Sequence, residues 1–228
     1  MRRQAFVGAL GVALVIAMAV AVSAQTAAPG GTRYLVGYVG VKPASSTSFK
    51  VAFNQYQSAS RVESGFMAYE LLEQIGKPGE FVVIETWRDQ EAADAHVAAA
   101  SRKTFFAALE PIRVTGYDER PYKTLEVAAP PAPPPGTVFV VTHVDVGPPG
   151  DAASLLKRLV DDSRGEPGCL RFDVLQHAAR ANHFTVIEAW RDQPAHDAHA
   201  AAAHTRQYRD ALQPIIGSPL DERLMKHP

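Results

Sequence analysis

The chain has 228 residues, of which 46% are hydrophobic and 21% are charged. This composition is that of a globular protein with enough apolar material for a core, in one large domain or two small ones. The formal net charge of −1 includes no basic excess of the kind that binds nucleic acid. A single cysteine, Cys169, excludes an intramolecular disulfide.

The N-terminus has the pattern of a targeting segment. Arg2 and Arg3 precede an almost wholly apolar run over 5–22, and Val22-Ser23-Ala24 is a small-residue cleavage site. We therefore expect a signal peptide over 1–24 and an exported protein, periplasmic or secreted, without a stable membrane anchor after processing. An uncleaved anchor is the competing interpretation, because the apolar run is almost long enough to span a membrane.

Apolar alternation, helical periodicity and turn signals predict four strands and two helices after the leader. In chain order these are a strand over 32–41, a helix over 48–61, strands over 66–73 and 80–88, a helix over 90–109, whole or broken near residue 101, and a strand over 117–126.

A proline-rich segment over 128–136 follows, and its composition is typical of a stiff spacer between domains. The same element order then returns. It comprises a strand over 137–146, a helix to residue 164 with Asp151 as N-cap, strands over 169–176 and 183–191, a helix over 193–212 and a short strand over 220–225. We divide the chain into a first repeat over 32–127 and a second over 137–228.

One stretch occurs twice and establishes the duplication. Residues 81–96 read FVVIETWRDQEAADAH, and residues 184–199 read FTVIEAWRDQPAHDAH, at an offset of 103 positions. Between 65–120 and 168–223, 24 of 56 positions are identical without a gap. The two halves are therefore copies of one structural unit.

The order β-α-β-β-α-β is the ferredoxin-like order of an α+β fold. Its helices cover one face of the sheet, so the other face stays apolar and must be buried against a partner. Two linked copies provide that partner within one chain. We expect an intramolecular pseudo-dimer whose sheets pack face to face, with further oligomerisation open.

The second copy resembles a known family. EPGCLRF over 166–172, FTVIEAWRD over 184–192, and Asp197-Ala-His199 with His204 five residues on are similar to antibiotic biosynthesis monooxygenases. That group of dimeric α+β barrels includes quinol monooxygenases. The resemblance implies oxygenation of a quinol or polyphenol by O2 in an apolar pocket, without a bound cofactor. The sequence also has no glycine-rich motif of the kind that binds a nucleotide.

Two other functions stay open. One is a non-catalytic, exported module that binds a small aromatic or apolar ligand, and the other is an interaction protein in which the sheets serve assembly.

The resemblance directs attention to residues of the second copy. His199 would be a base or orienting residue, Trp190 a pocket wall, and His204 and His143 secondary catalytic candidates. The further pocket candidates are Trp87, His96, Tyr38 and Glu188. Each also has a structural interpretation, such as a core tryptophan whose N–H is satisfied or a histidine that bonds its surroundings.

A metal site is not expected. His196, His199 and His204 lie near Asp192 and Asp197, but on one continuous helix residues 199 and 204 differ by about 140°. A solvated polar face accounts for them better. We expect function where the copies differ, at His204 against Ser101 and at His143 against Tyr38.

Overall fold

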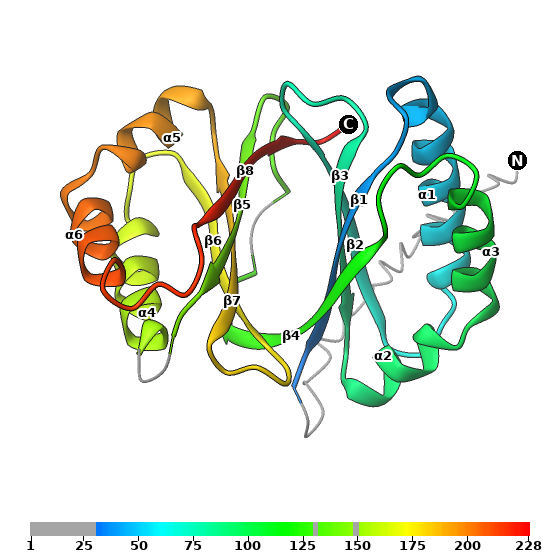
Figure 1. Cartoon of the computed structure of the whole chain (residues 1–228), viewed down its shortest axis with the longest axis horizontal. Coiled ribbons are helices and arrows are strands. Elements are labelled where there is room, and N and C mark those ends of the chain that lie inside the picture. Colours follow the sequence, from blue (N-terminus) through cyan, green and yellow to red (C-terminus); the bar gives the residue numbers. More distant parts are fainter. Residues whose placement is uncertain (1–30, 130–131, 148–150) are drawn as a thin grey trace, which may run out of the picture.

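The computed structural model describes residues 31–129, 132–147 and 151–228 (Figure 1). The signal peptide expected over 1–24 lies outside these residues. Within them, no helix combines the length and apolar character that crossing a membrane requires.

The described residues form two sets of elements in the same order. The first set is β1 (Arg33–Gly40), the 3-10 turn η1 (Pro43–Ser45), α1 (Ser46–Ser60), β2 (Phe66–Gln74), β3 (Glu80–Trp87), α2 (Gln90–Val97), α3 (Ala100–Leu109) and β4 (Asp118–Glu126). The second set is β5 (Val138–Asp145), α4 (Ala152–Ser163), β6 (Cys169–His177), β7 (His183–Trp190), α5 (Gln193–Ala200), α6 (Ala203–Leu212) and β8 (Asp221–Lys226).

These bounds agree with the predicted elements except at the last helix of the second copy, and in the first copy the helix expected over 90–109 is the broken form. The continuous helix expected over 193–212 is wrong, since α5 and α6 are separate helices. Ala202 has an extended backbone with φ −66° and ψ 151°, and Ala99 has the same conformation in the first copy. The chain therefore turns between the two helices, which changes the directions of the side chains after the break.

All strands of the described chain join one closed antiparallel barrel in the order β1-β3-β2-β8-β5-β7-β6-β4. Each copy contributes four adjacent strands. The copies meet where β4 pairs with β6, from Tyr122 opposite His177 to Glu126 opposite Val174, and where β2 pairs with β8. The expected pseudo-dimer is thus confirmed, and pairing between copies leaves neither sheet with an open edge.

The core has three layers. One apolar cluster lies between α1–α3 and the first sheet, and a second lies between α4–α6 and the other sheet. A third, with Val36, Leu72, Phe139 and Leu175, fills the space between the sheets. Figure 1 shows the helices on the two outer sides and the strands between them. The strands β1, β3, β5 and β7 are therefore buried on both faces over much of their length.

The duplicated Trp-Arg-Asp-Gln stretch forms the corner between strand and helix in each copy. Asp192 caps α5, because its side chain accepts a hydrogen bond from Ala195 N at 2.9 Å. Gly168 has φ +93°, and a Cβ there would lie 2.7 Å from Ala195 Cβ. Only glycine allows this close approach, which sets the helix against the sheet. The corner's recurrence reflects architecture.

The core predicts a large stability difference between two truncations. Leu156 is a fully buried residue of α4, so Leu156→Ala should lower the free energy of unfolding by about 2–5 kcal/mol. Val62 is 89% exposed, and Val62→Ala should change it by less than about 0.5 kcal/mol. Urea unfolding followed by circular dichroism measures both, and equal effects would contradict this account of the core.

Candidate functional site

Each copy places a glutamate, a tryptophan and a histidine against one another beneath its helices. In the second copy Trp190 is fully buried and its Nε1–H donates to Glu188 Oε2 at 2.8 Å. The ring of His199 stacks on Trp190 with centroids 4.6 Å apart. Glu85, Trp87 and His96 repeat this arrangement in the first copy. The tryptophans are therefore core residues with a satisfied N–H, and they also fix the histidine rings.

In the first copy, tyrosine hydroxyls fill the space around the histidine. Tyr56 donates to Glu85 Oε1 at 2.9 Å, and its oxygen lies 2.5 Å from His96 Nε2. The Tyr69 hydroxyl lies 3.0 Å from the same nitrogen. On the other side of the ring, His96 Nδ1 lies 2.7 Å from Glu63 Oε2. Both ring nitrogens are thus engaged.

The charge state of His96 follows from these neighbours. Burial lowers the pKa of His96, but the carboxylates of Glu85 and Glu63 outweigh burial and raise it above the ordinary value. Because Tyr56 gives its proton to Glu85, an imidazolium that donates from both nitrogens satisfies the network. The first copy therefore favours the protonated form of its histidine between two carboxylates.

The second copy lacks both hydroxyls. Leu159 and Phe172 stand 103 positions after Tyr56 and Tyr69. His199 Nε2 lies 3.9 Å from Glu188 Oε2, too far for a hydrogen bond. Burial lowers the pKa of His199, and it raises the pKa of Glu188 to about 8. The distance and both pKa directions indicate a neutral pair rather than an ion pair.

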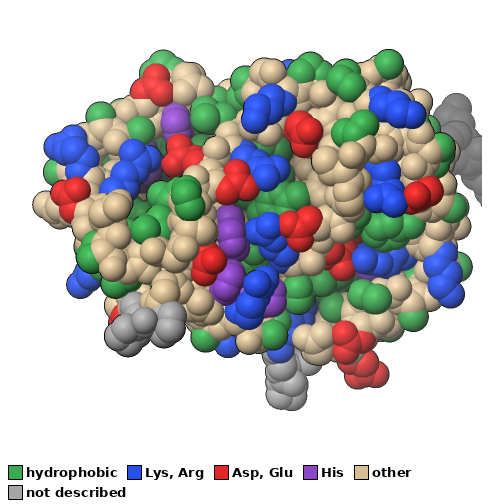
Figure 2. All heavy atoms as spheres, in the orientation of Figure 1, with side chains coloured by type: hydrophobic (Ala, Val, Ile, Leu, Met, Phe, Trp, Pro, Cys, Tyr) green, Lys and Arg blue, Asp and Glu red, His purple; other side chains and the backbone are tan. Residues whose placement is uncertain are grey.

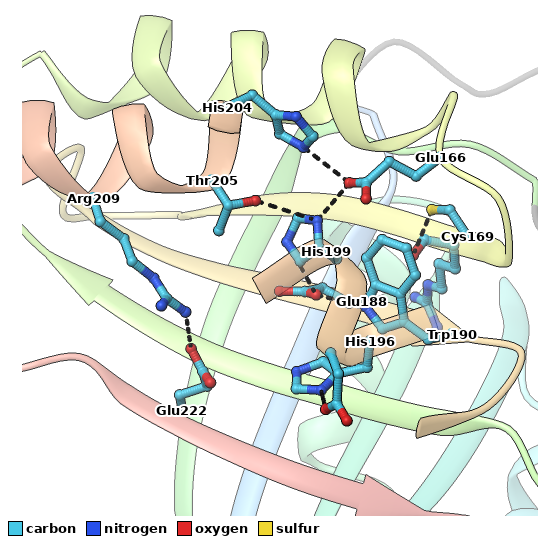
Figure 3. Close-up of polar contacts among 12 residues, drawn as sticks. Glu166, Cys169, Glu188, Trp190, His196, His199, His204, Thr205, Arg209 and Glu222 are labelled. Carbon is cyan, nitrogen blue, oxygen red and sulfur yellow. Dashed lines mark hydrogen bonds and ion pairs between the residues drawn. The ribbon is translucent and has the colours of Figure 1, made fainter. Parts of the chain in front are cut away.

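A second histidine joins the outer side of this site (Figure 3). Glu166 Oε1 accepts from His199 Nδ1 at 2.6 Å and from His204 Nε2 at 2.9 Å. The Thr205 hydroxyl lies 3.4 Å from His199 Nδ1. In the first copy, Ser101 donates to Glu63 in the place of His204. A glutamate thus bonds the buried histidine in both copies. Its second partner is Ser101 in the first copy and His204 in the second.

A groove lies between the helices at the equivalent place in each copy. The groove of the first copy has a volume of about 530 Å³. Its lining includes Tyr56, Glu63 and Ser101, together with the small residues Ala52 and Ala59. The groove of the second has about 260 Å³, because bulkier residues replace the alanines. Its lining residues are Leu155, Arg158, Leu159, Asp162, His204, Gln207, Tyr208 and Ala211.

Two polar residues that line the second groove, His204 and Tyr208, are partly buried. The His204 side chain is 23% exposed, and Glu166 fixes its Nε2. The Tyr208 hydroxyl is buried and has no hydrogen-bond partner among the described residues. A buried polar atom without a partner is uncommon in a folded protein.

His143 and Tyr38 lie elsewhere. Tyr38 belongs to the cluster between the sheets, and His143 pairs on β5 with Thr185 of β7. The His143 ring lies 5.8 Å from that of His183. These strand positions face the barrel interior, so a sheet separates them from the groove of His204. Figure 2 shows histidines gathered beside basic and acidic side chains near the middle of the visible face.

The grouping of site residues therefore differs from the sequence expectation. The structure brings His199, Trp190, Glu188 and His204 together, and it leaves His143 out. The sequence analysis separated His199 from His204 by about 140° because it placed both on one continuous helix. That placement was wrong, since they lie on α5 and α6. His196, in contrast, bonds Gln193 and Asp197 on its own helix.

Sequence reasoning overlooked Glu166, which joins the two histidines. A signal was present, since Glu63 and Glu166 match at the same offset of 103 as the histidines. Tyr56 falls within the helix predicted over 48–61. Its hydroxyl has a role that periodicity does not encode.

The fold and this arrangement define a tandem dimeric α+β barrel with a histidine–carboxylate site under the helices of each copy. The family model for antibiotic biosynthesis monooxygenases matches residues 32–108 and 137–211. The chain belongs to the antibiotic biosynthesis monooxygenase family.

Relatives agree with this assignment. YcnE of Bacillus subtilis, named as a candidate monooxygenase, is 33% identical over 73 residues, which cover 32% of this chain and 77% of YcnE. The crystal structure of a candidate monooxygenase from Fusobacterium nucleatum has a TM-score of 0.75 at 19% identity and covers 87% of this chain and 93% of its own. An anthrone oxidase-like protein has a TM-score of 0.69 at 11% identity, covering 89% and 93%. These two structures show the shared fold.

Removing one tyrosine hydroxyl should destabilise the first copy. Tyr56→Phe removes one of the buried donors to Glu85, and we expect a loss of about 1–3 kcal/mol in the free energy of unfolding. Tyr122→Phe is the matched control, because the buried Tyr122 hydroxyl has no partner among the described residues. Urea unfolding of both variants should show little change for Tyr122→Phe. Equal losses would contradict the network.

The raised pKa of His96 predicts a pH-dependent contribution to stability. A group whose folded-state pKa exceeds its unfolded value binds its proton more tightly in the folded state. Its contribution is complete below about pH 6.5, the unfolded value, and is lost as pH rises through the folded-state pKa. The unfolding free energy of the unmodified chain minus that of His96→Gln should therefore fall from pH 6.5 upward. A difference that stays flat or rises would refute it.

Proposed function

We propose that the chain is a monooxygenase that oxidises a quinol or polyphenol-like aromatic molecule with O2, without a bound cofactor, in the groove of the second copy. The observation that carries the proposal is the Glu166–His204 pair at that groove. Membership of the monooxygenase family gives the reaction class. The leader-like N-terminus places this activity outside the cytoplasm in our proposal.

The Glu166–His204 pair can act as a general base. A neutral His204 that donates its Nε2–H to Glu166 keeps a lone pair at Nδ1 for the proton of a substrate hydroxyl. The carboxylate holds the ring and stabilises the imidazolium that forms. Ser101 offers no such base at the equivalent place in the first copy. The proposal therefore assigns the chemistry to the second copy.

Two charged groups of the groove act on a phenolate in opposite directions. The Arg158 cation favours the anionic form of the substrate, whereas the Asp162 carboxylate opposes it. Leu155 and Leu159 provide apolar walls for an aromatic ring. The volume of about 260 Å³ lies near the lower end of typical ligand pockets, which favours a small aromatic molecule.

The oxidation balances without a redox cofactor. A deprotonated phenol adds O2 at an electron-rich ring carbon that carries hydrogen, and the resulting hydroperoxide loses water to leave a quinone. One oxygen atom ends in the new carbonyl and the other in water. The substrate supplies all four electrons that O2 accepts, so the protein has to bind, deprotonate and exclude water.

Oxygen uptake with a panel of dihydroxynaphthalenes and reduced menadione tests the proposal. We expect uptake by the purified chain. His204→Ser, which installs the residue of the first copy, should lower kcat by about 100-fold or more because it removes the base. His227→Ser, a histidine outside the groove, is the control and should leave uptake unchanged.

Two results would overturn this assignment. Absence of uptake with every compound would remove the enzyme claim. Full uptake by His204→Ser together with loss in Glu63→Gln would move the chemistry to the first copy.

The groove of the first copy supports a second candidate function, the binding of a small aromatic or apolar ligand without turnover. It is twice as large, at about 530 Å³, and alanines line much of it. Its histidine is already bonded on both ring nitrogens, so no free base faces a ligand there. Ligand binding that survives His204→Ser without oxygen uptake would identify this function.

A further inference from the structure

We propose that Glu166, His199 and His204 bind a divalent transition-metal ion such as Zn²⁺, and that the ion inhibits the second copy. The inhibition rests on the proposed function, whereas the metal binding does not. One ligand atom from each residue lies within 4.8 Å of the other two. Two imidazoles and one carboxylate are a common ligand set for zinc.

The distances need only small adjustment to hold an ion. Glu166 Oε1 lies 2.6 Å from His199 Nδ1 and 2.9 Å from His204 Nε2. Tetrahedral zinc with bonds of about 2.0–2.1 Å separates its ligand atoms by roughly 3.3–3.4 Å. Glu166 Oε1 therefore has to part from each nitrogen by less than an ångström, while the two histidine nitrogens, which lie within 4.8 Å of each other, come to the same separation. No backbone rearrangement is required, because His204 and Glu166 are partly exposed side chains.

The surroundings supply the remaining features of a metal site. The stack on Trp190, with ring centroids 4.6 Å apart, orients the imidazole of His199 from the side away from the ligands. His204 lines the groove, so a fourth position is open to water or to a small molecule. The proton that His204 holds on Nε2 has to move to Nδ1 or leave when an ion binds.

Inhibition follows from that proton. The base of the proposed reaction is the Nδ1 lone pair of His204, which exists only while Nε2 carries the hydrogen. An ion on Nε2 shifts the hydrogen to Nδ1, so metal binding and base action exclude each other. The same three residues thus have two alternative states, a hydrogen-bonded one and a metal-bound one.

The first copy provides a built-in comparison. Glu63 and His96 stand where Glu166 and His199 do, but Ser101 replaces His204. Two ligands remain, and the His96 ring is held between two carboxylates. We therefore expect one ion per chain and not two.

Metal binding is measured on the untagged, chelator-treated full chain with Zn²⁺ and a competing chromophoric chelator, and with Co²⁺ by its visible absorption. We expect one Zn²⁺ per chain. His204→Ser and Glu166→Gln should each weaken binding by at least about 10–100-fold. Ser101→His should raise the stoichiometry towards two. His143→Ala, which changes a histidine on the opposite face of the sheet, should bind as the unmodified chain does.

Circular dichroism confirms that each variant is folded. Absence of Zn²⁺ binding by the unmodified chain would overturn the proposal, as would unchanged affinity in His204→Ser. If binding is found but oxygen uptake is absent without metal, the metal site stands and the proposed oxygenation fails. If both are found, uptake should fall in proportion to bound Zn²⁺, and undiminished uptake at full occupancy would refute the inhibition.

Discussion

The mutual burial of two apolar sheet faces is the constraint on which the structure depends. A single β-α-β-β-α-β unit covers one face of its sheet with helices and leaves the other face bare. Here Val36 and Leu72 of the first copy pack with Phe139 and Leu175 of the second between the sheets. Pairing of β4 with β6 and of β2 with β8 then closes the barrel. The fused second copy supplies what separate subunits would otherwise provide.

Once the barrel is complete, the space under the helices of each copy is free to differ. The first copy fills its space with Tyr56 and Tyr69, whose hydroxyls bond a histidine between two carboxylates. The second copy has apolar side chains at those places and a histidine, His204, at the rim of the groove. The histidine of the first copy is thus bonded on both ring nitrogens in a closed network, whereas the second copy has a further histidine that lines a groove. Duplication thus allows the two sites to differ while the barrel stays the same.

Much of the fold was predictable because its signals are local or repeated. The offset of 103 positions identifies the two units, and Asp151 caps its helix as the sequence predicts. The candidate site was only partly predictable. His199, Trp190 and Glu188 came from the repeated stretch, whereas Glu166 comes from a loop and reaches them only through the fold. His143 was grouped with them because strand alternation does not say which face meets which neighbour.

The sequence by itself determined the element order, the duplication and the need for a covered sheet face, because periodicity and composition encode them residue by residue. Tertiary structure alone decided which polar groups meet. An extended residue, Ala202, breaks the helix that periodicity joined, and so brings His204 to the carboxylate of Glu166 beside His199. Contacts of this kind depend on the positions of separate elements in space, and no spacing along one helix could have given them.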